Sequence, residues 1–133
     1  MITLSPENWD ILNSVNREVN KYPYKTDSDL YSSVEFWTYI GLKGGDCEDY
    51  VLTKRRRLIE HGFDPAHLLP AIGITHNGEG HCILLIETDK GGYVLDNNFN
   101  SIIPWRSPKN LIKTWVSRAD VLNHMWVNFV DTE

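Results

Sequence analysis

The sequence has few cysteines, no long apolar run and no excess of basic residues. Its two cysteines, Cys47 and Cys82, form no C-x-x-C pair, so neither a zinc finger nor a disulfide framework is expected. No apolar run approaches the roughly 18 residues that span a bilayer, so no membrane insertion is expected. A formal net charge of −5 gives no general attraction for phosphate backbones, and nucleic acid is therefore not expected as a partner.

Several familiar sequence signals are also missing. Residues 1–7 contain neither a positive region nor an apolar core, so no secretory signal is expected and the cytoplasm is the default location. P-loop, G-x-S-x-G, G-x-G-x-x-G and EF-hand patterns do not occur. No repeat or linker divides the 133 residues, which predicts a single domain over residues 1–133.

Two helices are predicted in the first half of the chain. Ser5-Pro6-Glu7 is a typical helix start, and an apolar stripe continues from it until Pro23. A second helix opens after Gly44-Gly45-Asp46 and closes at His61-Gly62, with Cys47, Val51, Lys54 and Leu58 on one stripe. The basic run at 54–57 falls in this helix and is interpreted as a solvated face.

Strands dominate the second half. Residues 68–74, 81–87 and 93–96 are predicted to form adjacent antiparallel strands, joined in part by a hairpin turn at 89–92. The second strand is apolar on both alternating faces, so it is expected to be central. A short helix is predicted over 107–115 and a last strand over 125–130. The expected fold class is α+β, with an antiparallel sheet packed on the Cys47 helix.

Cys47 is the first candidate for chemistry. A thiol in the first turn of a helix lies near the positive end of the helix dipole and near unpaired N–H groups, which favour the nucleophilic thiolate. The preceding glycines allow a substrate to approach closely, and the amide of Cys47 could donate to an oxyanion. The alternative interpretation is a small buried hydrophobic residue.

His81 and Asp96 complete a candidate triad. His81 begins the central strand and Asp96 ends the next one, so a hairpin brings both residues to the same end of the sheet. There His81 could act as general base and acid for Cys47, and Asp96 could orient the imidazole. Taken alone, His81 could be a strand-end histidine and Asp96 a turn residue. The order Cys, His, Asp, with Cys at a helix start, is the transglutaminase/papain-like arrangement.

The motifs around these residues carry a family resemblance. Residues 45–50 (GDCEDY), 80–84 (GHCIL) and 93–97 (YVLDN) resemble the bacterial transglutaminase-like cysteine peptidase family. The resemblance implies a Cys47, His81, Asp96 triad that hydrolyses a peptide or isopeptide-type amide, with a protein or peptide as substrate. Short relatives without a signal sequence occur in tailed bacteriophages, so a virion-associated role is an alternative to the cytoplasm.

The resemblance also implies calcium and a substrate cleft. Known members bind calcium through acids beside the catalytic cysteine, and these acids match Asp46 and Glu48. No cofactor is expected for the chemistry itself. The alternative is that Asp46 caps the helix and Glu48 complements its dipole. Trp37, Gly45 and Gly80 are expected to line the cleft.

Three functions therefore stay open at this stage. The first is a cysteine peptidase or amidohydrolase that forms a thioester acyl-enzyme. The second keeps the triad but cleaves the stem peptide of peptidoglycan or transfers the acyl group to an amine. The third is a non-catalytic calcium-binding or structural module of the same fold.

Overall fold

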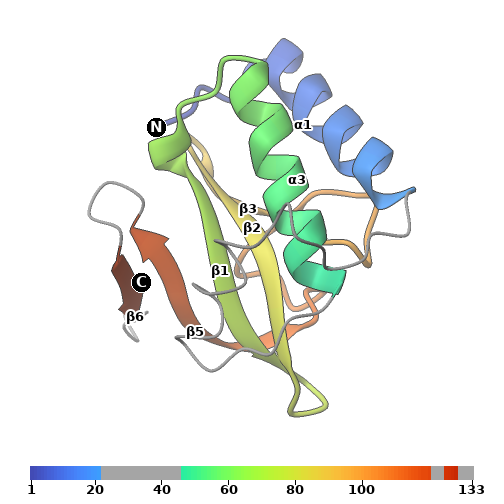
Figure 1. Ribbon diagram of the computed structural model, residues 1–133, viewed down its shortest axis with the longest axis vertical. Helices are drawn as coiled ribbons and strands as arrows, with labels where there is room; N and C mark the ends of the chain where they lie inside the picture. Colours follow the sequence, from blue (N-terminus) through green and yellow to red (C-terminus); the bar gives the residue numbers. More distant parts are fainter. Residues whose placement is uncertain (22–45, 121–124, 129–133) are drawn as a thin grey trace.

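The computed structural model describes residues 1–21, 46–120 and 125–128, with the side chains of 46–49, 117, 119, 120 and 125–128 excepted. Two α-helices and a short 3₁₀ helix accompany six strands in this part of the chain (Figure 1). Their bounds are α1 Pro6–Asn20, α3 Asp46–Glu60, η2 Pro65–His67, β1 Leu68–Thr75, β2 Gly80–Thr88, β3 Gly91–Leu95, β4 Ile103–Pro104, β5 Ile112–Asp120 and β6 Met125–Asn128.

Helix α1 begins as its sequence predicts. The Ser5 side chain accepts a hydrogen bond from the backbone N–H of Asn8 at 3.1 Å, and Pro6 occupies the first helical position. The helix ends at Asn20, before the predicted end at Tyr22 and Pro23, which lie outside the described residues. Neither α-helix in the described ranges is long and apolar enough to cross a membrane.

Helix α3 begins at Asp46 and ends in a Schellman motif. Gly62 has a φ of 96°, which glycine adopts without strain, and its N–H donates to the carbonyl of Ile59 at 2.9 Å. The N–H of Phe63 donates to the carbonyl of Leu58 at 3.1 Å, and the Phe63 side chain is buried. The predicted end of this helix at His61-Gly62 is confirmed, and the motif turns the chain toward β1.

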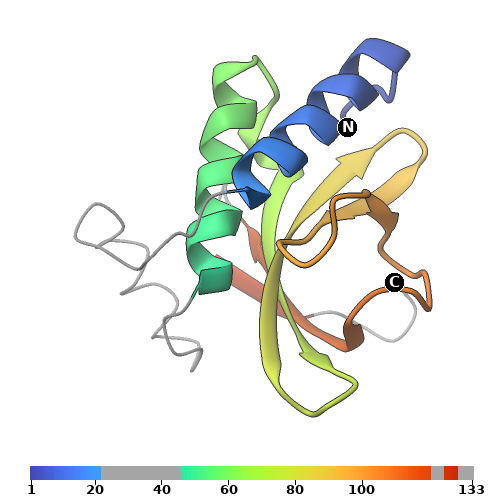
Figure 2. The same ribbon diagram turned by 90° about the vertical axis from the view of Figure 1, so that its right-hand side faces the viewer.

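The six strands form one antiparallel sheet in the order β4-β3-β2-β1-β5-β6. The prediction that β2 is central is confirmed, and the strand is buried on both faces. Its alternating residues Cys82, Leu84 and Ile86 join one core cluster, whereas Ile83 and Leu85 join a second. Both helices lie over the first face, as Figures 1 and 2 show from two sides. The fold is therefore α+β, as expected.

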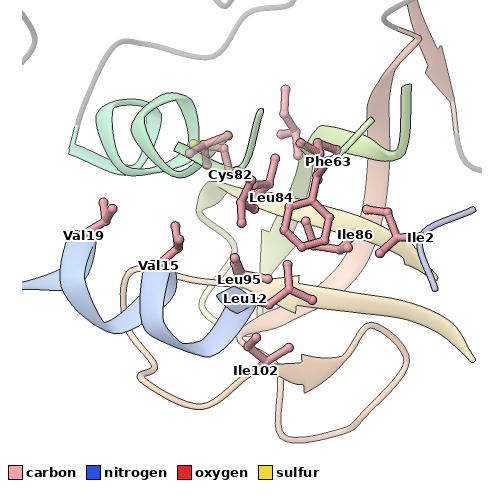
Figure 3. Close-up of a cluster of buried hydrophobic side chains, with 14 residues drawn as sticks. Ile2, Leu12, Val15, Val19, Phe63, Cys82, Leu84, Ile86, Leu95 and Ile102 are labelled. Carbon is pink, nitrogen blue, oxygen red and sulfur yellow. The ribbon is translucent and has the colours of Figure 1, made fainter. Parts of the chain in front are cut away.

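The larger core fills the space between the helices and the sheet. Figure 3 shows Leu12, Val15 and Val19 of α1 extending toward the sheet residues Leu84 and Leu95. All five side chains are buried. At roughly 1.5–3 kcal/mol for each fully buried aliphatic side chain, this contact accounts for much of the docking of α1.

The helix predicted over 107–115 is wrong. Ser107 and Pro108 begin only a turn, in which the N–H of Asn110 donates to the carbonyl of Ser107 at 3.2 Å. From Ile112 the chain is extended and pairs with β1, and Ile112 itself is buried. A serine–proline start signal therefore gave a single turn, because the edge of β1 supplies backbone partners for the residues that follow. The predicted last strand is confirmed at β6, over Met125–Asn128.

Candidate active site

The β2–β3 hairpin brings His81 and Asp96 together, as predicted. The two strands pair from Thr88 and Gly91 to Leu84 and Leu95, so Asp96 follows the last paired residue of β3. Nε2 of His81 lies 3.0 Å from Oδ1 of Asp96. The side chains are 12% and 3% exposed, so this contact is largely shielded from water.

The chemistry of this contact depends on the tautomer of the imidazole. An ionised carboxylate only accepts hydrogen bonds, so donation to Asp96 as a carboxylate requires the tautomer with the proton on Nε2 of His81. In the neutral ring the basic lone pair is then on Nδ1. An imidazole held in this way can take a proton at Nδ1 and become a cation that the adjacent carboxylate stabilises.

The carboxylate of Asp96 is itself held in position by its own loop. Oδ1 accepts from the backbone N–H of Asn98 at 3.0 Å and from the Asn98 side-chain amide at 3.4 Å. The carbonyl of Asp96 accepts from the N–H of Phe99 at 3.2 Å. Such an aspartate turn fixes the side-chain torsion, so the direction of Oδ1 toward His81 is set before any ligand binds.

Two asparagines of α1 donate hydrogen bonds to the backbone of this loop. Asn16 is fully buried, and its side-chain amide donates to the carbonyls of Phe99 at 2.9 Å and Asn100 at 3.2 Å. Asn20 donates to the carbonyls of Asp96 at 3.1 Å and Phe99 at 2.9 Å. Sequence analysis did not identify this role. The sequence signal that could have indicated this role is Asn16, a polar residue next to the apolar stripe of α1.

Lys54 is a residue whose environment the sequence analysis predicted wrongly. The run at 54–57 was interpreted as a solvated face, yet Lys54 is only 1% exposed. The position of Lys54 on the stripe with Val51 and Leu58 explains this, because that face of α3 packs on β2. Of this run, Arg56 is exposed to solvent, whereas Arg55 donates to the carbonyls of Leu68 and Pro65.

Burial has a large effect on the Lys54 amine. Removal from water lowers the pKa of Lys54 from 10.5 to about 7, although the negative charge of Asp96 opposes this shift. Cys82 acts in the same direction as Asp96 when it is ionised. Nζ of Lys54 has no hydrogen-bond partner in the described part of the chain, and it lies 6.0 Å from the ring centre of Tyr50.

The remaining predicted site residues lie on α3, on β2 or outside the described residues. The backbone of Cys47 lies in the first turn of α3, as expected, and Gly80 is the exposed first residue of β2. Cys82 is fully buried in the larger core. Trp37 and Gly45 lie outside the described residues, as do the side chains of Asp46, Cys47 and Glu48. Within the described side chains, no group of three acidic, histidine or cysteine residues could hold a metal ion.

The chain also matches a known protein family. The whole chain, residues 1–133, matches the family described as bacterial transglutaminase-like cysteine proteinase BTLCP. The protein belongs to this family. The hydrogen-bonded His81 and Asp96 therefore occur in a member of this family. A search of curated protein sequences found no match.

Solved structures show the same fold. Legionella pneumophila LapG in its calcium-bound form has a TM-score of 0.62 at 24% identity, over 87% of this chain and 66% of LapG. The EGTA-treated form of LapG has a TM-score of 0.64 at 21% identity, over 95% of this chain and 74% of LapG. The present chain thus spans about two thirds of the calcium-bound relative. At this identity the likeness establishes the shared fold.

Replacement of Asn16 tests the support that α1 gives to the Asp96 loop. Asn16→Ala removes the hydrogen bonds to the carbonyls of Phe99 and Asn100, of which only Phe99 keeps another donor, Asn20. We therefore expect it to lower the free energy of unfolding by about 1–3 kcal/mol. Urea denaturation would measure this. Asn13→Ala is the matched control, because Asn13 donates only within α1, to the carbonyl of Trp9. Equal losses in the two variants would contradict the assigned role.

Replacement of Lys54 tests its buried charge. Because the folded pKa of about 7 lies below the ordinary 10.5, Lys54 lowers stability most at or below pH 7. The penalty is relieved as pH rises from 7 toward 10.5. Lys54→Met should therefore be more stable than wild type at pH 6, by about 1–4 kcal/mol, and the difference should shrink at pH 9. Urea denaturation at both pH values would check this, and a variant less stable at pH 6 would contradict it.

Proposed function

We propose that the protein is a cysteine peptidase that cleaves a peptide or protein amide through Cys47, His81 and Asp96. One observation carries the proposal: the buried 3.0 Å contact between His81 and Asp96, in a chain of a cysteine proteinase family. The position of Cys47 in the first turn of α3 supports it, because the helix dipole favours a thiolate there.

Acylation is the first half of the proposed reaction. Nδ1 of His81 takes the Cys47 proton, and the thiolate attacks the amide carbonyl to form a C–S bond and an oxyanion. The first N–H groups of α3 lack helical acceptors, so the N–H of Cys47 is a candidate donor to that oxyanion. The intermediate then breaks its C–N bond, and the amine leaves with the proton from His81.

Deacylation returns the enzyme to its starting state. His81 takes a proton from water while the water oxygen attacks the thioester carbonyl. The C–S bond breaks, the carboxylic acid is released and Cys47 regains its proton through His81. Throughout this cycle Asp96 keeps Nε2 protonated and stabilises the imidazolium, without itself taking the proton.

The same triad supports the alternative enzyme function. A peptidoglycan stem peptide contains amides that would react in the same way, and an amine in place of water would make the protein an acyl transferase. A non-catalytic module would need no buried histidine–carboxylate pair. The pair at 3.0 Å therefore favours an enzyme.

Calcium is a candidate for the start of α3. Asp46, Glu48 and Asp49 offer the hard carboxylate oxygens that calcium prefers, within the first turn of the helix. LapG has been solved both with calcium and after EGTA treatment. Bound calcium would supply local order and positive charge beside Cys47. We propose Asp46 and Glu48 as its ligands in this chain.

Alkylation of Cys47 tests the proposed pair. We expect iodoacetamide to modify Cys47 well below pH 8, and His81→Ala to slow this reaction by at least about tenfold, because the thiolate loses its cation. Mass spectrometry would measure both cysteines, with buried Cys82 as the internal control. Cys47→Ser should abolish peptide cleavage and remain folded. Equal rates in wild type and His81→Ala would contradict the triad.

Calcium addition tests the proposed ligands. Binding to the folded state alone raises the melting temperature, so calcium at about 100 times its Kd should raise Tm by several degrees. Asp46→Asn with Glu48→Gln should remove this shift, whereas Glu60→Gln, an exposed residue at the other end of α3, should keep it. Magnesium is the ion control. An equal shift in the double variant would exclude these ligands.

A further inference from the structure

Lys54 lies on the same face of α3 as Cys47, seven residues further along the helix. Two turns separate the two backbone positions by about 10.5 Å along the helix axis. The side chain of Lys54 is buried at the junction of α3 with β2. The candidate nucleophile and the buried amine therefore belong to one helix that packs on the strand carrying His81.

Among the described residues, the groups that act on the Lys54 amine come from three elements. Asp96, just after β3, provides the negative charge, Cys82 of β2 provides a thiol, and Tyr50 of α3 provides an aromatic ring 6.0 Å away. The asparagines of α1 that reach this end of the sheet are uncharged. His81 is linked to the amine through Asp96. Within the part of the chain that the structure describes, Asp96 is therefore the group that connects Lys54 to His81.

A purely structural role does not account for this lysine. Burial of an ammonium is costly unless hydrogen bonds compensate, and Nζ has no such bond in the described ranges. Methionine or leucine would fill the same volume between Val51 and Leu58 without that cost. A buried amine that carries a penalty next to a reactive group is typical of functional sites.

We propose that Lys54 is a positioning residue whose positive charge acts on the Asp96 carboxylate and sets how strongly Asp96 stabilises protonated His81. The inference rests on the proposed triad. Charged Lys54, buried on the face of α3 that packs on β2, attracts the carboxylate that contacts His81 through Oδ1. Protonated Lys54 and protonated His81 interact with the same carboxylate. Each therefore reduces the electrostatic stabilisation that Asp96 gives to the other.

This sharing matters for the leaving amine. His81 must give up its proton when the C–N bond breaks, and a carboxylate with no second partner would bind the imidazolium more tightly. Lys54 limits that stabilisation, so His81 remains a competent acid. Without the lysine charge the pKa of His81 should rise and proton donation should slow.

Titration of His81 by NMR tests this without any substrate. The full chain with Cys47→Ala removes the coupling between His81 and the thiol, so Lys54 is the coupled group that the variants change. In Lys54→Met and in Lys54→Gln we expect the pKa of His81 to rise by about one unit relative to the same protein with Lys54. Lys54→Arg, which keeps the charge, should leave it at or below the reference value. Arg56→Met, which removes an exposed charge from the same helix, is the matched control.

Kinetics supply the second readout. Lys54→Met should lower kcat for peptide cleavage about tenfold, with KM unchanged, and should move the alkaline limb of the pH profile upward. An unchanged His81 titration in both uncharged variants would overturn the proposal. If the wild type cleaves no peptide, the proposed function fails, while the titration still decides the role of Lys54.

Discussion

The burial of β2 on both faces is the constraint on which the rest of the structure depends. Cys82, Leu84 and Ile86 require the helices above them, and Ile83 and Leu85 require cover on the opposite face. A slip of one residue against β3 would exchange these two faces, so the hydrophobic effect fixes the hairpin register. That register also fixes where the polar ends of β2 and β3 meet. The contact between His81 and Asp96 is thus a consequence of core packing.

Polar groups at this end of the core are stabilised from outside the sheet. The Asp96 loop is held by amides of Asn16 and Asn20, which are on a helix that the same core docks. Because rigid elements support each hydrogen bond, the carboxylate of Asp96 is held in one orientation toward His81. The buried amine of Lys54 fits this pattern less well, since it costs stability and gains no hydrogen bond. Stability given up at one position is expected where charge has a function.

The sequence predicts those features that depend on local pattern. The start of α1, the end of α3, the β2–β3 hairpin and the pairing of His81 with Asp96 all follow from capping residues, alternation and turn signals. The strand β5 cannot be predicted from local signals, because its extended conformation depends on pairing with the edge of β1, which is distant in sequence. The support from Asn16 also depends on a loop more than eighty residues away, and no local pattern reports such a contact.

Lys54 shows how two readings of one segment can conflict. By composition, the four consecutive basic residues indicate a solvated face. By position, Lys54 occupies the apolar stripe of α3 between Val51 and Leu58, where each step of about 100° separates it from its basic neighbours. Burial follows position, as its 1% exposure shows, because the packing of the stripe on β2 is worth more than the solvation of one amine. A charged residue at a core position of an otherwise consistent helix is thus a signal in its own right, since local rules are broken mainly where chemistry requires it.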